Sequence, residues 1–592
     1  MPRGLRFALS SLLIGAMSLG LAYAGAVLTP PAGITDGVGT KASVQEAETG
    51  QQDAAATSDI APPGTGLINA GAAKISLFPR PEDYQEAFPG ARWERDYDKC
   101  ATLAPTQDAI EGTATHVADY RVRWAENPNC LYMGGYGIGP MFPITEWDDD
   151  YGLWVRSIAM QDAQKDTVIL TLIDAVYWEA YYNSLCEGCG FLELADQLSA
   201  ELGIPAKSFI FASTHSHTAM DFIGGWGAVP EWYMQQATDS LKEAVRQSVE
   251  NMRPAVLEAG ESFARPFSAE RRDFYRSAED NAMSWFRLVY ADEQPQEEVC
   301  TVSMPPPPSP EPANNGNGNG NGYGNAGKAT PSPYPSPIET CEPAVPGRAI
   351  ATVGAYAAHP VTEDHERPGE ADADFPAVFA KAVEDEYEGV GMFLQTGLGN
   401  VSPRGNKVEM GTGLAELVPA IGGGDTISNP DVAVGRKNWI QPVTNAPLGA
   451  LGVGGFFDRR MNEAPATLTV GKGPENTKCH SASPISVNTS VSAAKIGPLW
   501  ITGGPGELFS GITNTIEEKN PNGITMALGL VNDGLGYLIQ SYETDYAGRE
   551  GPGFVGDVEG EVGVAEYEDA YSIDHCIGDA ALEYTLQLLG QL

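Results

Sequence analysis

Two of the seven histidines stand two positions apart, directly after a run that is typical of a buried strand. They are His215 and His217, which follow the run Ser208–Ala212 (SFIFA). In an extended segment, side chains two residues apart point the same way. Ligands of α/β sheets usually lie at the carboxyl ends of the strands. The pair therefore indicates a metal site, and the alternative is a polar turn with two solvated histidines.

A third histidine, His359, also ends a strand-like run, Ile350–Ala358, and precedes Pro360. The proline restricts how the chain leaves the strand. Taken alone, such a histidine is more often a turn residue. A catalytic zinc site combines a few His, Cys, Asp or Glu ligands with one position for water. Together with the His pair, His359 becomes a candidate ligand.

A glycine-rich segment, LQTGLGNVSPR, spans Leu394–Arg404 and carries Ser402. Its glycines Gly397 and Gly399 would allow backbone N–H groups to approach an oxyanion, or they form an ordinary tight turn. The chain contains neither the G-x-S-x-G nucleophile motif nor an H-E-x-x-H zinc motif.

A second glycine-rich segment, GGPGELF, places Glu507 between a strand-like and a helix-like run. There the carboxylate is a metal-ligand candidate or a partner of the helix dipole. A polar, aromatic loop follows further along the chain and contains Tyr537, Tyr542 and Tyr546.

The elements that position these residues alternate between strand and helix. Strands are expected at Thr167–Ile173, Ser208–Ala212, Ile350–Ala358, Gly391–Gln395, Leu499–Thr502 and Ile524–Leu530. Helices are expected at Leu192–Leu202, Trp232–Met252, Phe375–Tyr387, Leu508–Glu518 and Asp574–Leu589. This alternation predicts an α/β fold of layered mixed sheets with flanking helices, in a single large domain.

Six segments taken in order carry a resemblance. They are Met133-Gly134-Gly135-Tyr136, FASTHSH, AAHPVT, LQTGLGNVSPR, GGPGELF and GLVNDGLGYLIQSYETDY. In this order the chain resembles the neutral, non-lysosomal ceramidase family over Ile75–Leu592. The resemblance implies a zinc-dependent amidase that hydrolyses the N-acyl bond of ceramide, or of a related N-acyl lipid, to a fatty acid and a sphingoid base.

The resemblance also implies one Zn²⁺ per chain and a set of ligands. The family's ligands are the first histidine of His-x-His, the histidine of His-Pro, the glutamate of Pro-Gly-Glu and a downstream tyrosine. In this sequence they fall on His215, His359, Glu507 and Tyr537, with Tyr542 and Tyr546 as alternatives for the tyrosine. Their side chains should converge on one point.

Two further residues are implied at the centre of the reaction. His217 would lie beside the metal as an acid/base group or substrate ligand. Ser402 matches the family's proposed catalytic serine, either as nucleophile or as a group that orients substrate. A metal-activated water, a histidine that transfers protons and a donor to the oxyanion together suit amide hydrolysis.

Two other functions remain open. One is a related zinc hydrolase that acts on a non-ceramide ester or amide. The other is an inactive extracellular binding protein with the same fold. The presence of all the candidate ligands and catalytic residues argues against this second alternative. The immunoglobulin-like domain that follows the catalytic domain in the family is expected to be absent.

The strongly negative net charge limits the kinds of molecule that the chain can bind. The 592 residues include 78 acidic and 36 basic side chains, which gives a net charge of −42. Nucleic acid is excluded as a partner because phosphate binding needs clustered Lys and Arg. An anionic membrane would repel the chain. A lipid-like small molecule is the expected partner.

The organisation is that of an exported protein. Residues 1–24 read as a cleaved signal peptide, with an uncleaved anchor as the alternative, and no second stretch is apolar enough to span a membrane. Residues 25–74 read as a disordered leader and 75–592 as the catalytic domain, with ordered sequence starting near Ile75. A Pro/Asn/Gly-rich insertion at about 303–345 is expected to be disordered.

Eight cysteines in an exported chain suggest disulfides. Cys186 and Cys189 are expected to close a small loop, and Cys300 and Cys341 to hold the base of the insertion. The remaining pairs, by elimination, are Cys100 with Cys130 and Cys479 with Cys576.

Overall fold

The computed structural model of the chain describes fourteen segments, and the statements below concern these residues. They are residues 64–90, 130–134, 143–182, 186–224, 229–264, 267–270, 282–294, 299–303, 338–342, 347–362, 370–455, 457–471, 478–543 and 566–592. Tyr546, Cys100, the expected signal peptide and most of the expected leader lie outside the described residues.

A large mixed sheet forms the centre of the molecule. In spatial order its strands are β13 (Val390–Gln395), β11 (Ala349–Tyr356), β8 (Ala282–Tyr290), β6 (Arg253–Phe263), β1 (Ile68–Ser76), β3 (Trp154–Gln161), β4 (Thr167–Ile173) and β5 (Phe209–Ser213). The short strand β15 (Asp425–Thr426) pairs with β6. The end pairs β11–β13 and β4–β5 are parallel, and the strands between them pair antiparallel.

A second sheet of four strands packs face to face on the first. Its order is β16 (Val432–Pro442), β19 (Ser486–Ile496), β20 (Leu499–Gly503) and β22 (Ile524–Leu528). Buried residues of both sheets, such as Ile158, Leu257, Val434 and Ile501, form one hydrophobic cluster. This shared core fixes the second sheet against the first, because two apolar faces are removed from water together.

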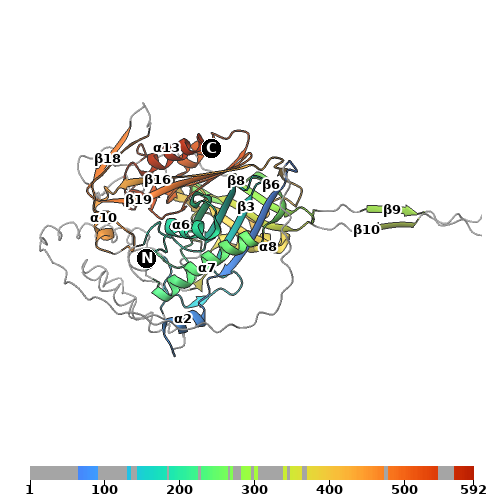
Figure 1. Cartoon of the computed structure of the whole chain (residues 1–592), viewed down its shortest axis with the longest axis horizontal. Helices are drawn as coiled ribbons and strands as arrows, with labels where there is room; N and C mark the ends of the chain where they lie inside the picture. The colour runs from blue at the N-terminus through green and yellow to red at the C-terminus, as the bar shows by residue number, and fades with distance from the viewer. Residues whose placement is uncertain are drawn as a thin grey trace, which may run out of the picture.

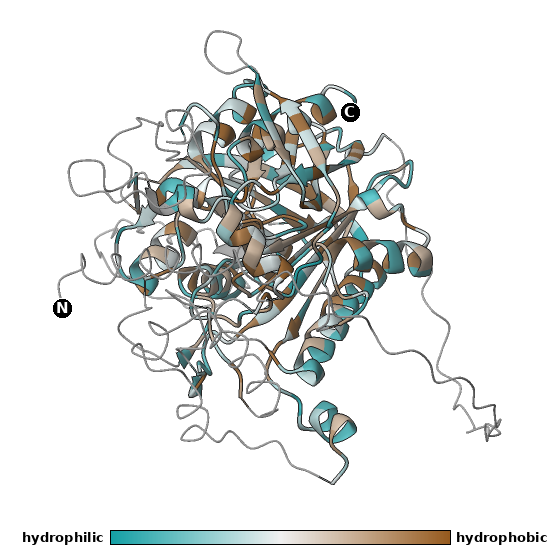
Figure 2. Cartoon of the chain, turned by 90° about the vertical axis from the view of Figure 1, so that its left-hand side faces the viewer, coloured by the Kyte–Doolittle hydropathy of each residue, from teal (hydrophilic) through white to brown (hydrophobic). Residues whose placement is uncertain are grey.

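Helices cover the two outer faces. The helices are α2 (Pro81–Ala87), α6 (Phe191–Leu202), α7 (Glu231–Glu250), α8 (Phe375–Tyr387), α9 (Lys407–Ala415), α10 (Ala446–Val453), α11 (Ser510–Glu517), α12 (Glu566–Ala570) and α13 (Ile577–Leu589). Helices α6 to α9 pack on the free face of the large sheet, and α11 and α13 pack on the small sheet. Hydrophobic residues accordingly concentrate on the strands and on one face of the helices (Figure 2). The predicted fold of layered mixed sheets with flanking helices is confirmed.

Five two-stranded pairs complete the described elements. They are β9 (Val299–Ser303) with β10 (Ile338–Glu342), β2 (Glu146–Trp147) with β12 (Glu370–Ala371), β7 (Ser268–Glu270) with β14 (Val401–Pro403), β17 (Ala466–Val470) with β18 (Cys479–Ser483), and β21 (Glu507–Leu508) with β23 (Tyr537–Leu538). The strands β9 and β10 project away from the body as a ribbon (Figure 1). Residues 338–342, which the sequence assigns to the disordered insertion, therefore pair as a strand.

The segment after β22, residues 529–532, joins the two ends of the large sheet. The N–H of Gly529 donates to the carbonyl of Gln395 at the end of β13, at 3.0 Å. The N–H of Ser213 at the end of β5 donates to Leu530 at 3.2 Å, and the N–H of Asn532 donates to Phe211 at 2.8 Å. The strand ends at opposite sides of the sheet are therefore brought together around this segment.

Ordered structure begins earlier than the sequence predicts. Strand β1 starts at Ile68 and lies in the interior of the large sheet, not beyond Ile75. Its many small residues do not alternate with polar ones in the way that predicts a strand. Small residues are needed here because helix α7 packs closely against the strand. A Cβ on Gly71 would lie 2.3 Å from the carbonyl oxygen of Ser248 in α7. The composition rich in Ala and Gly, which suggests a flexible leader, is therefore the composition that close packing against α7 requires.

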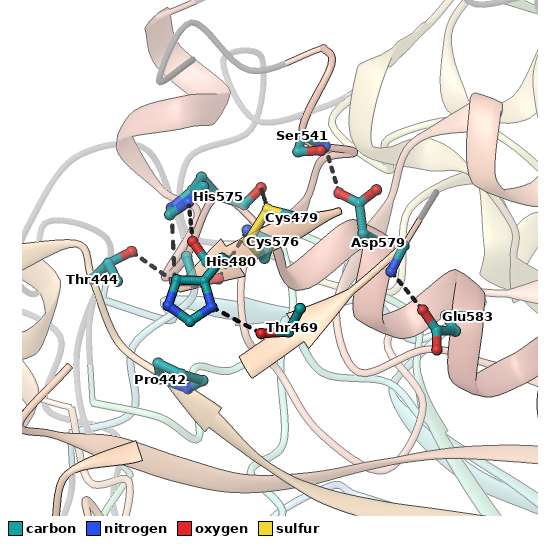
Figure 3. The surroundings of a disulfide bond; sticks show 12 residues. Pro442, Thr444, Thr469, Cys479, His480, Ser541, His575, Cys576, Asp579 and Glu583 are labelled. Atoms are coloured by element: carbon teal, nitrogen blue, oxygen red, sulfur yellow. Dashed lines mark hydrogen bonds and ion pairs between the residues drawn. A yellow bond between two sulfur atoms is a disulfide. The ribbon is translucent and has the colours of Figure 1, made fainter. Parts of the chain in front are cut away.

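The described cysteines include two of the expected disulfides. Cys186 pairs with Cys189, and Cys479 of β18 pairs with Cys576 just before α13 (Figure 3). In the backbone register of β9 and β10, Cys300 stands opposite Cys341. Cys130 is disulfide-bonded, while its expected partner Cys100 lies outside the described residues. Among the described residues, no helix combines the length and apolar character that crossing a membrane requires.

Candidate metal centre

Three side chains from distant parts of the sequence meet in the interior. They are His215 after β5, His359 after β11 and Glu507 on β21, and their ligand atoms all lie within 4.8 Å of one another. The Nε2 atom of His359 lies 2.9 Å from Oε2 of Glu507, and Nε2 of His215 lies 3.6 Å from the same oxygen. All three residues are at most 3% exposed.

His215 is held by the segment that follows the neighbouring strand. Its Nδ1 lies 3.1 Å from the carbonyl oxygen of Val176, which follows β4, the parallel neighbour of β5. The backbone of His215 has a φ of 61°, which is uncommon for a residue with a side chain. The His-x-His segment is thus not extended, and the side chains of His215 and His217 meet because the chain turns here.

Met133 and Gly134 begin the Met-Gly-Gly-Tyr segment and pack beside Val176, whereas Gly135 and Tyr136 lie outside the described residues. Met133 forms an isolated bridge with Met220, and Gly134 donates its N–H to Ala219 at 2.9 Å. A Cβ on Gly134 would lie 2.0 Å from a methyl carbon of Val176. Glycine is therefore required at position 134 for the chain to pack against Val176, the residue that orients His215.

His359 is oriented in the same way by another element. Its Nδ1 lies 3.0 Å from the carbonyl oxygen of Val401, at the start of β14. Ser402 is the next residue, and it is half-buried and paired with Ala269 of β7. The predicted serine therefore stands next to the carbonyl that anchors a candidate ligand.

Glu507 and Tyr537 lie opposite each other. They are paired residues of the parallel strands β21 and β23, and the ring of Tyr537 lies 6.2 Å from that of His359. Tyr542 is 43% exposed, and its hydroxyl donates to Gln540 at 2.8 Å. The geometry therefore favours Tyr537 over Tyr542 as the tyrosine of the site.

The protonation pattern suits a bound cation. A carbonyl oxygen can only accept, so the Nδ1 atoms of His215 and His359 carry protons, and their Nε2 atoms face Glu507. Burial raises the pKa of the Glu507 carboxyl, but His215, His359 and the Tyr177 hydroxyl outweigh it and hold the pKa at about 2. A cation that takes the place of the Nε2 protons would meet two imidazoles and one carboxylate, and this donor set fits Zn²⁺.

His217 lies beside the cluster of His215, His359 and Glu507. Its Nε2 is 3.4 Å from Nε2 of His215, and its backbone N–H donates to the carbonyl of Pro360 at 3.2 Å. The next residue, Thr218, donates to a carboxylate oxygen of Asp372 at 2.9 Å, and Lys407 forms an ion pair with that carboxylate. The His-x-His segment is therefore anchored on both sides of His217.

The glycine-rich turn before Ser402 serves close packing. A Cβ on Gly397 would lie 2.7 Å from the hydroxyl of Thr513, and a Cβ on Gly399 would lie 2.7 Å from the carbonyl oxygen of Glu507. The turn thus presses against the segment that carries Glu507. This supports the structural interpretation of these glycines over an oxyanion site.

Solved structures that resemble most of the chain include two ceramidases. One, titled "Ceramidase complexed with C2", has a TM-score of 0.50 at 12% sequence identity and covers 89% of this chain and 76% of its own. The other, the crystal structure of neutral ceramidase from Pseudomonas aeruginosa, has a TM-score of 0.46 at 12% identity, covering 80% and 69%. The chain has a ceramidase fold. No protein-family model matches the sequence, and no curated protein matches it either.

One residue that contacts the candidate ligands was missed by sequence reasoning. Tyr177 follows β4, its hydroxyl donates to Oε1 of Glu507, and its ring centre lies 4.8 Å from that of His215. The signal was present in the sequence, because Tyr177 follows a buried strand just as His215 does. Parallel neighbours such as β4 and β5 end at the same edge of a sheet.

A buried ionic cluster beside the site was also missed. Arg459 forms ion pairs with Glu179 and Asp533, and the carboxylate of Asp533 accepts from the Thr489 hydroxyl at 2.7 Å and from the N–H of Ala180 at 3.0 Å. The cluster ties the segment after β4 to the loop that leads into β23. These charges are far apart in the sequence, which left no local signal.

Proposed function

We propose that the chain is a zinc-dependent amide hydrolase that cleaves the N-acyl bond of ceramide or a related N-acyl lipid. His215, His359 and Glu507 would hold the zinc ion, and Tyr537 would supply a fourth protein ligand. The products would be a fatty acid and an amine with a sphingoid-base character.

The observation that carries the proposal is the shared orientation of the three donors. Two imidazoles present Nε2 while their Nδ1 atoms are engaged by the carbonyls of Val176 and Val401. Metal-binding histidines are typically fixed by a second hydrogen bond of this kind. A structural ion pair would need only one histidine for Glu507, so the second one argues for a bound cation.

The surrounding residues suit amide hydrolysis. Bound zinc supplies a Lewis acid that polarises the amide carbonyl and lowers the pKa of water. His217 is placed to hold a proton and pass it to the leaving nitrogen. The Ser402 hydroxyl would act on the acyl carbon or orient the amide, because it follows the carbonyl that fixes His359.

Two observations favour an apolar substrate. The chain has a ceramidase fold. In addition, Val176 and Tyr177 belong to a buried apolar cluster with Ile223, Leu398 and Leu530, against which Phe457 packs. The metal would therefore have apolar surroundings, which would suit an N-acyl substrate. Export is part of the proposal, and the disulfides of the chain are typical of an oxidising compartment.

Hydrolysis of a fluorescent short-chain ceramide tests the proposal. We expect the purified chain to release the fatty acid, to lose activity when the metal is chelated and to regain it with added zinc. The variant His215→Ala should lose more than about 100-fold in kcat/KM because a metal ligand is removed. His480→Ala is the matched control, since this histidine is exposed on β18.

The outcomes separate the alternatives. Activity that survives both the chelator and His215→Ala would rule out the zinc mechanism. Zinc binding without ceramide hydrolysis, but with turnover of short esters or N-acyl amino compounds, would assign the site to a related hydrolase. Zinc binding with no turnover of any of these substrates would point to a binding protein.

A further inference from the structure

Tyr177 lies against two of the three candidate ligands at once. It is 5% exposed, its ring packs on His215, and its hydroxyl donates to Oε1 of Glu507. The Nε2 atoms of His215 and His359 approach the other carboxylate oxygen, Oε2. The two oxygens of Glu507 therefore have different partners.

This division has a chemical consequence. A free carboxylate can bind a cation through one oxygen or through both. A hydrogen bond to Oε1 withdraws that oxygen and leaves Oε2 for the cation. We propose that Tyr177 is a positioning residue that makes Glu507 a one-oxygen metal ligand and fixes its rotamer. The inference rests on the proposed zinc site but not on the identity of the substrate.

Tyr177 is itself held rigidly. A Cβ on Gly534 would lie 2.8 Å from the Tyr177 ring, so the loop that leads to β23 packs directly on it. Two residues further on, Glu179 is ion-paired with Arg459. A side chain fixed in this way can fix another, because little conformational freedom remains to be lost when the metal binds.

The neighbouring residue completes the arrangement. Val176 supplies the carbonyl that sets the tautomer of His215, and Tyr177 supplies the hydroxyl that orients Glu507. Consecutive residues after β4 thus position two ligands that come from β5 and β21. Outer residues of this kind typically change metal affinity by about 10–100-fold when they are removed.

Zinc affinity of the full chain, measured by competition with a chromophoric chelator, tests the inference without any substrate. Tyr177→Phe keeps the ring against His215 and removes only the hydroxyl, so we expect zinc to bind about 10–100-fold more weakly. Tyr233→Phe is the control. Tyr233 is also buried, and its hydroxyl donates to the carbonyl of Leu77 at 2.6 Å, away from the site. It should lower stability by a similar amount and leave zinc affinity unchanged.

A double-mutant cycle with Glu507→Ala shows whether Tyr177 acts through Glu507. If it does, Tyr177→Phe has no further effect on zinc affinity once the carboxylate is gone. Wild-type affinity in Tyr177→Phe overturns the inference. So does an undiminished effect in the Glu507→Ala background, which would make Tyr177 a ligand itself. A Tyr177→Phe chain that fails to fold while Tyr233→Phe folds would assign Tyr177 a structural role instead.

The cycle distinguishes this inference from the proposed function. Absence of zinc binding by the wild-type chain would overturn the zinc site and the inference together. Normal zinc binding and a normal cycle without ceramide hydrolysis would overturn only the proposed substrate.

Discussion

At the scale of single residues, several residues near the candidate site have a positive φ, which is unusual for residues other than glycine. Of the six described non-glycine residues with a positive φ, His215, Leu530 and Asn532 lie together where β5 meets the segment after β22. Asp374 also has a positive φ, and its N–H donates to Asp372, while Lys165 and Glu388 lie elsewhere. Such conformations cost of order 1–3 kcal/mol each and persist only where surrounding contacts require them. The hydrogen bonds of the joined sheet ends supply those contacts.

Asp374 gives a prediction for the pH dependence of stability. Burial, with Asp372 nearby, raises the pKa of the Asp374 carboxyl to about 7. In the unfolded chain the pKa is about 3.9. The folded state therefore favours the protonated form, and the stability gained from this group is lost as the pH rises from about 4 to about 7, by up to about 1.4 kcal/mol per pH unit.

Asp374→Asn should remove this contribution. Asparagine tolerates a positive φ and can cap α8 as the aspartate does, by accepting from the N–H of Phe375. Denaturant unfolding of wild type and variant between pH 4.5 and 8 measures the difference. Asp385→Asn, at an exposed position of the same helix, is the control. Parallel pH profiles for wild type and Asp374→Asn would contradict the prediction.

The decisive feature at the scale of elements is the segment that joins the ends of the large sheet. Strands β11 and β5 stand near opposite ends of the strand order, yet His359 and His215 follow them and meet. Residues 529–532 bond to β13 on one side and to β5 on the other. The amide of Gln395 adds a link by donating to the carbonyl of Thr214 at 3.2 Å. The site exists because this segment lies between the sheet ends.

Asn532→Ala should weaken this junction. The Asn532 side chain accepts from the N–H of Phe211 at 3.0 Å and donates to the Ser492 hydroxyl at 2.8 Å, and its φ is 60°. Loss of two buried hydrogen bonds, with alanine forced into a left-handed conformation, should cost roughly 3 kcal/mol. Zinc should also bind more weakly because β5 is loosened.

Equilibrium unfolding and zinc competition measure the two effects of Asn532→Ala. Asn438→Ala, at an exposed position of β16, is the control and should change neither quantity by more than about 0.5 kcal/mol. A stability loss no larger than that of the control would show that the junction does not depend on Asn532.

The whole molecule is secured by a long-range covalent link across its carboxyl-terminal half. The Cys479–Cys576 disulfide spans 97 residues and attaches the β17–β18 hairpin to the start of α13 (Figure 3). The Cys186–Cys189 disulfide spans three residues. In the chain-entropy model a longer loop restricts the unfolded chain more strongly.

The paired replacements Cys479→Ser/Cys576→Ser and Cys186→Ser/Cys189→Ser should therefore differ. The chain-entropy model gives a loss of about 5 kcal/mol for the long loop and about 1.6 kcal/mol for the short one. Denaturant unfolding under non-reducing conditions measures both variants against wild type. Equal losses would show that local strain or packing, and not loop entropy, governs these bonds.

The sequence by itself determined the element types and the candidate ligands. Apolar runs fixed β4 at Thr167–Ile173 and α8 at Phe375–Tyr387 with the bounds the structure has. They did so because periodicity and helix caps act between near neighbours. Strand β1 was not predicted because its small residues are required by packing against α7, and a pattern of neighbouring residues does not show such a contact.

Only the tertiary structure decided which strand ends meet. The spacing of His215, His359 and Glu507 along the chain carries no information about their separation in space, since that depends on the strand order and on the segment that joins the sheet ends. The role of Tyr177 was decided in the same way, by the parallel pairing of β4 with β5 and by the position of β21. The sequence shows which chemical groups are present, but the pairing of strands that are distant in the sequence determines where each group lies.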